Sequence, residues 1–363
     1  MKIAFVHFYT FRLFRGIETL IISLANALVE KGIEVSIVSA RPTIQPLIEP
    51  DPRIKIYTYP TFRYFEHLTI VPFYVTHFAR YEYDQVVVFF ADFGEGIAWR
   101  IINKIRDIPL ILYLCYPYSD VPERYHSFLD LGWQHKAKHI LADATWVADE
   151  AQELFQASVS VVPIGTNPDR FRPDSVKRKA LRQQLGFSDN EVVLLNVSAL
   201  EQRKGTWRVI KAMGRLKDKF PLLRYFILGQ GDDERNLRQM VKELQLEDVV
   251  IFGGTTSQLE YYYNMADIFI MLSDSEANSI ACIEAMSCGL PVVVSRGGGF
   301  AETVPDQAGF LVAPDIFEEI DTELMKLIDN PLLRQRMGEV GRLHILDNFT
   351  WGRIADRYLE LTQ

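Results

Sequence analysis

The sequence predicts an α/β protein with two domains, and three observations support this. Short apolar runs of buried-strand length alternate with stretches of helical periodicity along the chain. A length of 363 residues is long for one hydrophobic core and comfortable for two domains of ordinary size. The proline-rich segment Val161–Pro173 interrupts the alternation and is the best domain boundary on composition alone.

The chain opens with a predicted βαβ unit. Ile3–Val6 is a short apolar strand, Glu18–Lys31 is a helix that Gly32 ends, and Val35–Val38 is the next strand. Such a unit takes a right-handed crossover, so its two strands should be parallel. The remaining elements expected in the first half are strands at Val86–Phe90, Leu110–Leu114 and Ile140–Asp143, and helices at Gly94–Lys104 and Thr145–Phe155.

The second half repeats the same alternation. Its expected strands are Val192–Val197, Tyr225–Leu228, Val249–Phe252, Ile268–Leu272 and Pro291–Val294. Helices are expected from the turn at Gly205 to Leu216, over Leu259–Ala266, and over 279–288, where Cys288 and Gly289 end the last one. Ligands of such sheets bind at the carboxyl ends of the strands, which directs attention to the loops there.

The loop after Ile268–Leu272 has the features of an anion site. Asn278 or Ser279 can cap the following helix, so the free N–H groups of its first turn suit a phosphate. Glu276 precedes that helix and Glu284 lies inside it, at a spacing that lets both carboxylates face one side. Paired glutamates are usually a solvated helix face, but apolar strands flank this helix. Carboxylates accept hydrogen bonds from vicinal diols, so a sugar nucleotide is the expected ligand.

Composition narrows the classes of function. The formal net charge of −8 argues against nucleic acid as a partner, which demands a basic stripe. The basic cluster Lys177, Arg178, Lys179 and Arg182 is interpreted as a solvated helix face. No stretch approaches the roughly twenty apolar residues of a membrane span, and no signal peptide precedes the first strand. The three cysteines have no metal-ligand spacing and suit a reducing cytoplasm, which is the expected location.

A dense run of motif residues resembles the signature of the retaining GT-B glycosyltransferases of family four. That signature is Glu, seven residues, Glu, then Ala-Met-x-Cys-Gly-x-Pro-Val-Val and a Gly-Gly-x-x-Glu loop. The matching residues here are Glu276, Glu284, Ala285, Met286, Cys288, Gly289, Pro291, Val292, Val293, Gly298, Gly299 and Glu302. So many ordered matches within about thirty residues make the signal strong.

The resemblance implies an α/β GT-B fold, with two Rossmann-like domains facing each other across a cleft. It implies an acceptor-binding domain at 1–165, a donor-binding domain at 166–349, and a C-terminal helix at about 350–363 that packs back on the first domain. It also assigns roles: Glu276 positions the transferred sugar, Glu284 holds the ribose, and Lys204 binds the diphosphate. Further donor contacts are expected from Arg203, Asn278, Ser279, Ile280, Gly229, Gly231, Gly298 and Gly299, and Gly16 is expected in a loop near the phosphate and acceptor.

The sequence departs from the family pattern at several positions. Ala199 stands where relatives carry a diphosphate-binding arginine, and neighbouring Arg203 is the candidate to compensate. Cys115 or Tyr116 replaces a histidine that many relatives place near the transferred sugar. Arg15 replaces the first glycine of the loop at Gly16, and the interdomain segment has Ile164 and Asn167 for Asn and Asp.

Residues 54–83 are rich in aromatic side chains and leave two interpretations open. Ordinary core packing is one. The other is a surface that stacks on sugars or rests against a membrane presenting a lipid-linked acceptor, with the protein at the inner membrane face. The residues concerned are Tyr57, Tyr59, Phe62, Tyr64, Phe65, Phe73, Tyr74, Phe78, Tyr81 and Tyr83, with Arg63, His67, His77 and Arg80 between them.

The expected function is transfer of a sugar from a nucleotide diphosphate sugar to an acceptor hydroxyl with retention of configuration. The partners are the nucleotide sugar donor and a saccharide, lipid-linked or small-molecule acceptor, with no nucleic acid. No metal and no cofactor is expected, because Lys204, the Gly297–Gly299 amides and the helix start would stabilise the leaving diphosphate. The alternatives are a sugar-nucleotide epimerase or hydrolase of the same fold, and a degenerate member that binds a sugar nucleotide or a partner protein without catalysis.

Overall fold

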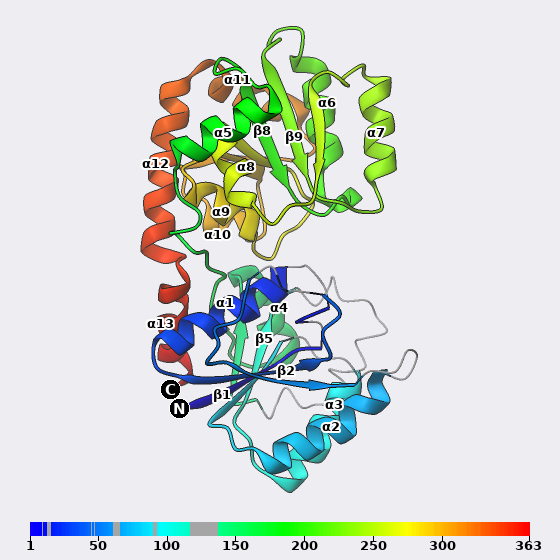
Figure 1. The fold of residues 1–363 in the computed structure, drawn as a ribbon, viewed down its shortest axis with the longest axis vertical. Coiled ribbons are helices and arrows are strands. Elements are labelled where there is room, and N and C mark those ends of the chain that lie inside the picture. The colour runs from blue at the N-terminus through cyan, green and yellow to red at the C-terminus, as the bar shows by residue number, and fades with distance from the viewer. Residues whose placement is uncertain are drawn as a thin grey trace. The chain divides into compact units, whose positions relative to one another are not determined.

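The chain folds into two compact α/β units (Figure 1). Unit 1 consists of Met1–Ile164 and Trp351–Gln363, and unit 2 of Gly165–Thr350. This computed structural model describes all residues except 9, 13–15, 45, 47, 61–65, 90–92 and 117–136, and leaves the side chains of 66–69 and 93–96 undescribed. Among the residues so described, none of the helices combines the length and the apolar character that crossing a bilayer requires.

Unit 1 contains a parallel seven-stranded sheet in the order β3-β2-β1-β4-β5-β6-β7. Helices α1 and α13 pack together on one side of it, and α2 packs against α3 on the other (Figure 1). Its elements are β1 (Lys2–Val6), α1 (Gly16–Glu30), β2 (Glu34–Ala40), β3 (Lys55–Tyr59), α2 (Glu66–Arg80), β4 (Gln85–Phe89), α3 (Phe93–Ile105), β5 (Leu110–Leu114), β6 (His139–Ala142), α4 (Thr145–Phe155), β7 (Ser160–Val161) and α13 (Trp351–Thr362).

Helix α13 is tied to the centre of the unit 1 sheet by buried polar contacts. Gln85 at the start of β4 donates its side-chain amide to the carbonyl of Thr362 at 2.7 Å. The Tyr358 hydroxyl donates to Gln85 Oε1 at 2.8 Å. All three residues are buried, and a buried polar side chain needs such partners to offset its desolvation. The last helix of the chain is therefore part of the first unit.

The aromatic segment is divided between the interior of unit 1 and half-buried positions. Tyr59, Tyr74 and Phe78 are fully buried, and Phe78 lies 4.9 Å from the Trp99 ring of α3. The core-packing interpretation holds for these residues, whereas Tyr57, Phe73, Tyr81 and Tyr83 are half-buried. Phe62, Arg63, Tyr64 and Phe65 lie outside the described residues, as does the side chain of His67.

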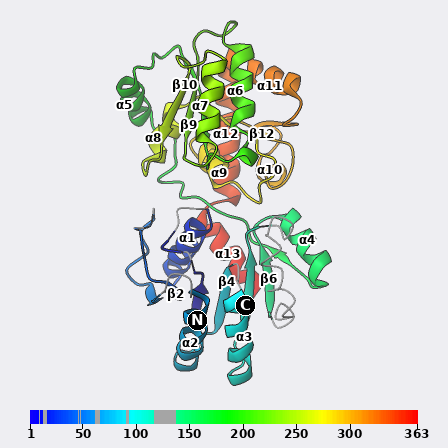
Figure 2. The ribbon, with the colours of Figure 1, turned by 90° about the vertical axis from the view of Figure 1, so that its right-hand side faces the viewer.

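Unit 2 contains a parallel six-stranded sheet in the order β10-β9-β8-β11-β12-β13. Figures 1 and 2 show helices on both of its faces: α6 packs with α7 and α11, while α5 packs with α8 and α9 with α12. Its elements are α5 (Ser175–Leu185), β8 (Val192–Val197), a 3₁₀ turn (Gln202–Lys204), α6 (Thr206–Leu216), β9 (Leu223–Leu228), α7 (Glu234–Glu243), β10 (Val250–Gly254), α8 (Leu259–Met265), β11 (Ile268–Met271), α9 (Ile280–Ser287), β12 (Val292–Ser295), α10 (Phe300–Thr303), β13 (Gly309–Val312), α11 (Phe317–Asp329) and α12 (Pro331–Asn348).

The predicted fold class, α/β with two Rossmann-like parallel-sheet domains, is confirmed. The strands at 110–114 and 192–197 and the helix at 145–155 match their predicted bounds. Helix α1 begins two residues before its predicted start, at Gly16. Central strands such as β1, β8 and β11 are covered on both faces, and this explains why they read as continuous apolar runs.

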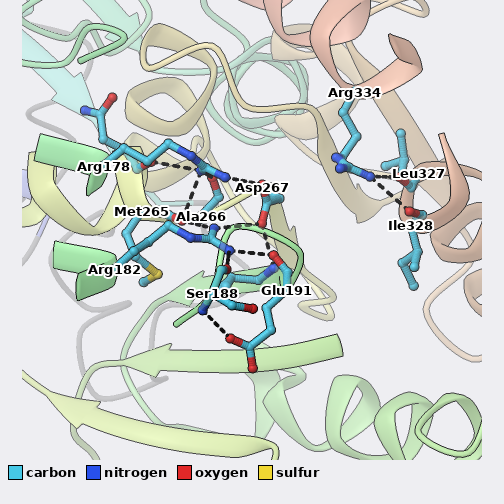
Figure 3. A network of polar contacts seen from close by, with 12 residues as sticks. Arg178, Arg182, Ser188, Glu191, Met265, Ala266, Asp267, Leu327, Ile328 and Arg334 are labelled. Atoms are coloured by element: carbon cyan, nitrogen blue, oxygen red, sulfur yellow. Dashed lines mark hydrogen bonds and ion pairs between the residues drawn. The ribbon is translucent and has the colours of Figure 1, made fainter. Parts of the chain in front are cut away.

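The prediction of a solvated face for the basic cluster on α5 is wrong for its two arginines. Arg178 Nη1 donates to the carbonyls of Asn264, Met265 and Ala266, and its Nη2 pairs with Asp267 at 2.7 Å (Figure 3). The last carbonyls of a helix lack intrahelical partners, so the end of α8 needs such donors.

Arg182 extends the same network into the interior of unit 2. Its side chain is only 2% exposed and donates to carbonyls at Met265, Ser188 and Glu191 and to the Asp267 carboxylate (Figure 3). The partner Asp267 lies 85 residues further along the chain, which local periodicity does not reveal. Lys179, by contrast, is exposed as predicted.

Candidate functional site

The candidate site lies at the carboxyl ends of the central strands of unit 2. Strand β8 is flanked by β9 and β11, so the chain order reverses beside it, and ligands of open α/β sheets bind at such points. Lys204 follows β8, Glu276 follows β11, and Gly298 and Gly299 follow β12. Three predicted site segments thus come from three adjacent strands.

Lys204 and Glu276 form the central contact of this site. The Lys204 ammonium donates to Glu276 Oε1 at 2.5 Å, and the two side chains are 14% and 9% exposed. Little water screens a pair this buried, so the charges act strongly on each other and on any ligand that reaches them. The motif predicted both residues, but nothing in the sequence predicted that they pair.

Glycine at position 205 allows the Lys204 turn to lie against the end of β11. Gly205 has φ +68°, and a Cβ there would stand 1.7 Å from the carbonyl oxygen of Leu272. No other residue fits without moving one of the two segments.

Arg208, which sequence reasoning missed, ties these segments together. Its guanidinium is 6% exposed, donates to the Leu272 carbonyl at 3.1 Å and pairs with Asp274 and Asp315 at 2.7 and 2.9 Å. An arginine on the buried face of α6, one turn after Lys204, was the available signal. Because one guanidinium carries several N–H donors, Arg208 contacts Leu272 and Asp274 together and holds the loop that leads to Glu276.

Glu284 lies inside α9 and has a different partner from Glu276. The Tyr263 hydroxyl of α8 donates to Glu284 Oε2 at 2.9 Å. Burial raises the pKa of Glu284 to about 7, and the hydrogen bond from Tyr263 opposes that rise. The carboxylates of Glu276 and Glu284 thus have separate environments, and no contact joins them in the part of the chain that the structure describes.

The sequence left two candidates for the N-cap of α9, Asn278 and Ser279. Ser279 is the N-cap, and its Oγ accepts from the Cys282 amide at 3.3 Å. Asn278 instead accepts from the Thr303 hydroxyl at 3.3 Å. Ile280 is the first residue of α9 and is half-buried. Of the two predicted caps, the structure selects Ser279.

The glycines after β12 make room for the loop that bears Glu276. A Cβ at Gly298 would stand 2.5 Å from the Glu276 carbonyl oxygen, and one at Gly299 would stand 1.8 Å from that of Ala277. The Gly299 amide donates to the Glu276 carbonyl at 2.9 Å. That amide is therefore engaged within unit 2, and the contact of the Gly297–Gly299 amides with a diphosphate stays a prediction.

Gly229 and Gly231 have a similar role beside β8. A Cβ at Gly229 would stand 1.8 Å from the Ser198 carbonyl oxygen, and one at Gly231 would stand 2.3 Å from that of Leu200. The Gly229 amide donates to the Gly254 carbonyl. Close packing of backbone requires both glycines, and a donor contact stays a prediction.

Arg203 lies at the edge of the site. Its guanidinium is 49% exposed and pairs with Glu201 at 2.8 Å. That pairing holds the side chain beside its own turn, so compensation for Ala199 requires the pair to open.

In unit 1, Gly16 is the exposed first residue of α1, and Arg15 lies outside the described residues. Cys115 is buried, which raises the pKa of its thiol well above the usual value. Tyr116 is 41% exposed. The departures at these positions remain without an assigned role.

The residues that the structure describes contain no candidate metal site. No three His, Cys, Asp or Glu side chains gather there in a way that could hold an ion.

Two sequence families match the chain. "Glycosyl transferases group 1" matches residues 177–344, and "Glycosyltransferase Family 4" matches residues 14–170. The GDP-mannose-dependent alpha-(1-6)-phosphatidylinositol monomannoside mannosyltransferase of Mycolicibacterium smegmatis is 34% identical over 215 residues. That alignment covers 56% of this chain and 56% of that enzyme, so the chain spans little more than half of its relative's length.

Solved structures share the whole fold at lower identity. Sucrose-phosphate synthase from Thermosynechococcus elongatus superposes with a TM-score of 0.82 at 22% identity, over 99% of this chain and 98% of that one. HepE from Anabaena in complex with UDP gives 0.81 at 19% identity, over 99% of each chain. The two-unit architecture is therefore common to this chain and these proteins.

Proposed function

Because the chain belongs to the family 4 glycosyltransferases, we propose that it moves a sugar from a nucleotide diphosphate sugar to an acceptor hydroxyl with retention of anomeric configuration. The observation that carries the proposal is the buried Lys204–Glu276 pair at the switch point of the unit 2 sheet. A buried ammonium beside a helix start suits the diphosphate, and a carboxylate beside it suits sugar hydroxyls.

The chemistry proposed for Lys204 is electrostatic. The leaving nucleoside diphosphate develops negative charge as the glycosidic bond breaks, and a preorganised cation stabilises that charge most where water is scarce. An ammonium carries three N–H donors, so Lys204 can keep its bond to Glu276 while it donates to a phosphate oxygen. No metal ion is part of this proposal.

The two glutamates receive different roles. Glu276 lies next to the phosphate-binding ammonium, and we assign it to orienting the hydroxyls of the transferred sugar rather than to covalent attack. Glu284, held from behind by Tyr263, accepts hydrogen bonds from the ribose. Retention itself is supported by the family resemblance.

The donor and the acceptor are proposed as classes. The names of the similar proteins mention GDP-mannose and UDP, so a GDP- or UDP-sugar is the first candidate donor. The acceptor is proposed to be a saccharide, a lipid-linked sugar or a small molecule with a free hydroxyl, at a membrane surface if it is lipid-linked.

Release of nucleoside diphosphate tests this function. Purified protein is incubated with UDP-, GDP- and ADP-sugars, with and without a panel of alkyl glycosides and polyols as acceptors. The proposal expects release from one donor that requires an acceptor, and a product whose anomeric configuration by NMR equals that of the donor. Equal release without acceptor would indicate a hydrolase or epimerase, and tight binding without release would indicate a non-catalytic protein.

A further inference from the structure

Tyr263 lies directly behind the proposed ribose-binding carboxylate. The ring is fully buried near the end of α8, with Phe171 5.8 Å and Phe269 6.3 Å from its centroid. Burial and packing against these two rings hold the Tyr263 ring in place, and with it the direction of its hydroxyl. That hydroxyl donates to Glu284 Oε2 at 2.9 Å.

The other groups around Glu284 are engaged elsewhere. Arg170 is the cation that acts on Glu284, but its Nε donates to Glu260 Oε2 at 3.0 Å. The charge of Glu260 also acts on the Glu284 carboxyl and raises its pKa, while the Glu284 charge raises the pKa of the Cys288 thiol. The Arg342 guanidinium on α12 donates to the backbone carbonyl of Ser287. Among the described residues, Tyr263 is the one hydrogen-bond donor to the Glu284 carboxylate.

We propose that Tyr263 is a positioning residue: by holding Oε2 of Glu284 it presents the free lone pairs of that carboxylate to the ribose diol, and so makes the site select ribonucleotides. A carboxylate offers about four lone-pair sites, and Tyr263 uses one of them. This inference rests on the proposed function. Beyond that function, it makes the preference for ribose over deoxyribose in the nucleotide depend on Tyr263, which does not touch the ligand.

The protonation of Glu284 gives the proposal a second consequence. Burial raises the pKa of Glu284 to about 7, whereas the Tyr263 hydrogen bond lowers it. Ribose hydroxyls donate to the ionised carboxylate, so nucleotide affinity should rise with pH through that range and level off above it. Removing the hydroxyl removes an interaction that favours the ionised form, so the rise should move to higher pH.

The test compares Tyr263→Phe with Tyr262→Phe. Tyr262 is next to Tyr263 on α8, and the centroid of its ring lies 5.4 Å from that of Phe226. Its aromatic neighbour therefore differs from Phe171 and Phe269, the neighbours of Tyr263. Calorimetric titrations with UDP, GDP and ADP, and with their 2′-deoxy counterparts, are run from pH 6 to pH 9. Glu284→Gln, which keeps an acceptor for Tyr263 but has no charge to titrate, is measured in parallel.

The proposal expects Tyr263→Phe to weaken binding of the preferred ribonucleotide by about tenfold at pH 7, because the Glu284 carboxylate loses its fixed direction and part of its ionised form, and a tenfold change corresponds to about one pKa unit. Binding of the deoxynucleotide should change little, so the preference for ribose falls. The pH profile should move upward in Tyr263→Phe, disappear in Glu284→Gln and stay unchanged in Tyr262→Phe.

Two results overturn the inference and are distinguishable from each other. A Tyr263→Phe protein with the ribose preference and pH profile of the wild type would overturn the positioning role and leave the proposed function standing. A wild-type protein that binds none of the nucleotides would overturn the proposed function together with the inference.

Discussion

Replacing Lys204 by methionine removes the ammonium and keeps a side chain of similar length. Lys204 lies in the turn between β8 and α6 and is only 14% exposed, so water screens its charge little. The change leaves the Glu276 carboxylate, 9% exposed, without its partner. The site then presents a negative charge where a diphosphate is expected, which reverses the sign of its electrostatic contribution.

The size of the effect follows from the geometry. Two unit charges about 4 Å apart interact by about 4 kcal/mol at an effective dielectric constant near 20. Part of this is offset by desolvation, and a hydrogen bond to a charged group contributes about 1.5–3 kcal/mol net. A loss of about 3 kcal/mol of transition-state stabilisation corresponds to a fall of about 100-fold in kcat/KM.

A double-mutant cycle separates this mechanism from a general disturbance. Adding Glu276→Gln to Lys204→Met removes the stranded charge, so nucleoside diphosphate binding should recover part of its loss, in a non-additive way. Lys242→Met, at an exposed position on α7, is the control for loss of one positive charge. Initial rates of nucleoside diphosphate release and calorimetric binding are measured for all variants. A Lys204→Met protein within twofold of wild type, or strictly additive losses in the cycle, would refute the reasoning.

Three further predictions concern other parts of the structure. Gly299→Ala should reduce transfer by at least tenfold in rate assays, because its Cβ would stand 1.8 Å from the Ala277 carbonyl and displace the Glu276 loop, whereas Gly352→Ala, with open space around it, should be neutral. Arg182→Met should lower the free energy of unfolding of unit 2 by about 3–5 kcal/mol in urea titrations, because it strands part of the buried network, whereas exposed Lys179→Met should change it by less than about 0.5 kcal/mol. Treatment with EDTA should leave the transfer rate unchanged, and a rate that falls and returns with added Mg²⁺ would contradict the proposed metal-independent mechanism.

The sequence predicted those strands and helices whose burial produces a clear local pattern of apolar residues. Strands β5 and β8 are buried on both faces, so their apolar runs begin and end where the elements do. For helices of mixed composition, such as α5, the sequence did not predict which polar side chains are buried. The long basic side chains of α5 resemble a solvated surface until their acceptors, at the end of α8, are known.

The candidate site shows the same limit. The motif identified Lys204, Glu276 and Glu284 individually, because each has a characteristic place in it. The spacing of residues along the chain does not reveal contacts between segments that follow different strands. The Lys204–Glu276 pair and the hydrogen bond from Arg208 to the Leu272 carbonyl are therefore known only from the structure. Tyr263 stands in a run of three tyrosines, and nothing local indicates which one reaches Glu284.

The glycine run after β12 shows why a glycine motif has more than one interpretation. The loop at Gly298 and Gly299 was predicted to approach a diphosphate, which stays a prediction, and in the structure its backbone packs against residues 276 and 277. A glycine run marks a place where two objects come close together, and sequence alone does not distinguish a ligand from another segment of the chain.

Thermal denaturation with UDP, GDP and ADP tests the central claim, that the site around Lys204 and Glu276 binds a nucleoside diphosphate. A ligand at 100 times its dissociation constant stabilises the native state by about 2.7 kcal/mol. One of the three nucleotides should raise the unfolding midpoint of the wild type, and the increase should be largely lost in Lys204→Met and retained in Lys242→Met. The claim is contradicted if none of them raises the midpoint, or if Lys204→Met shows the full increase.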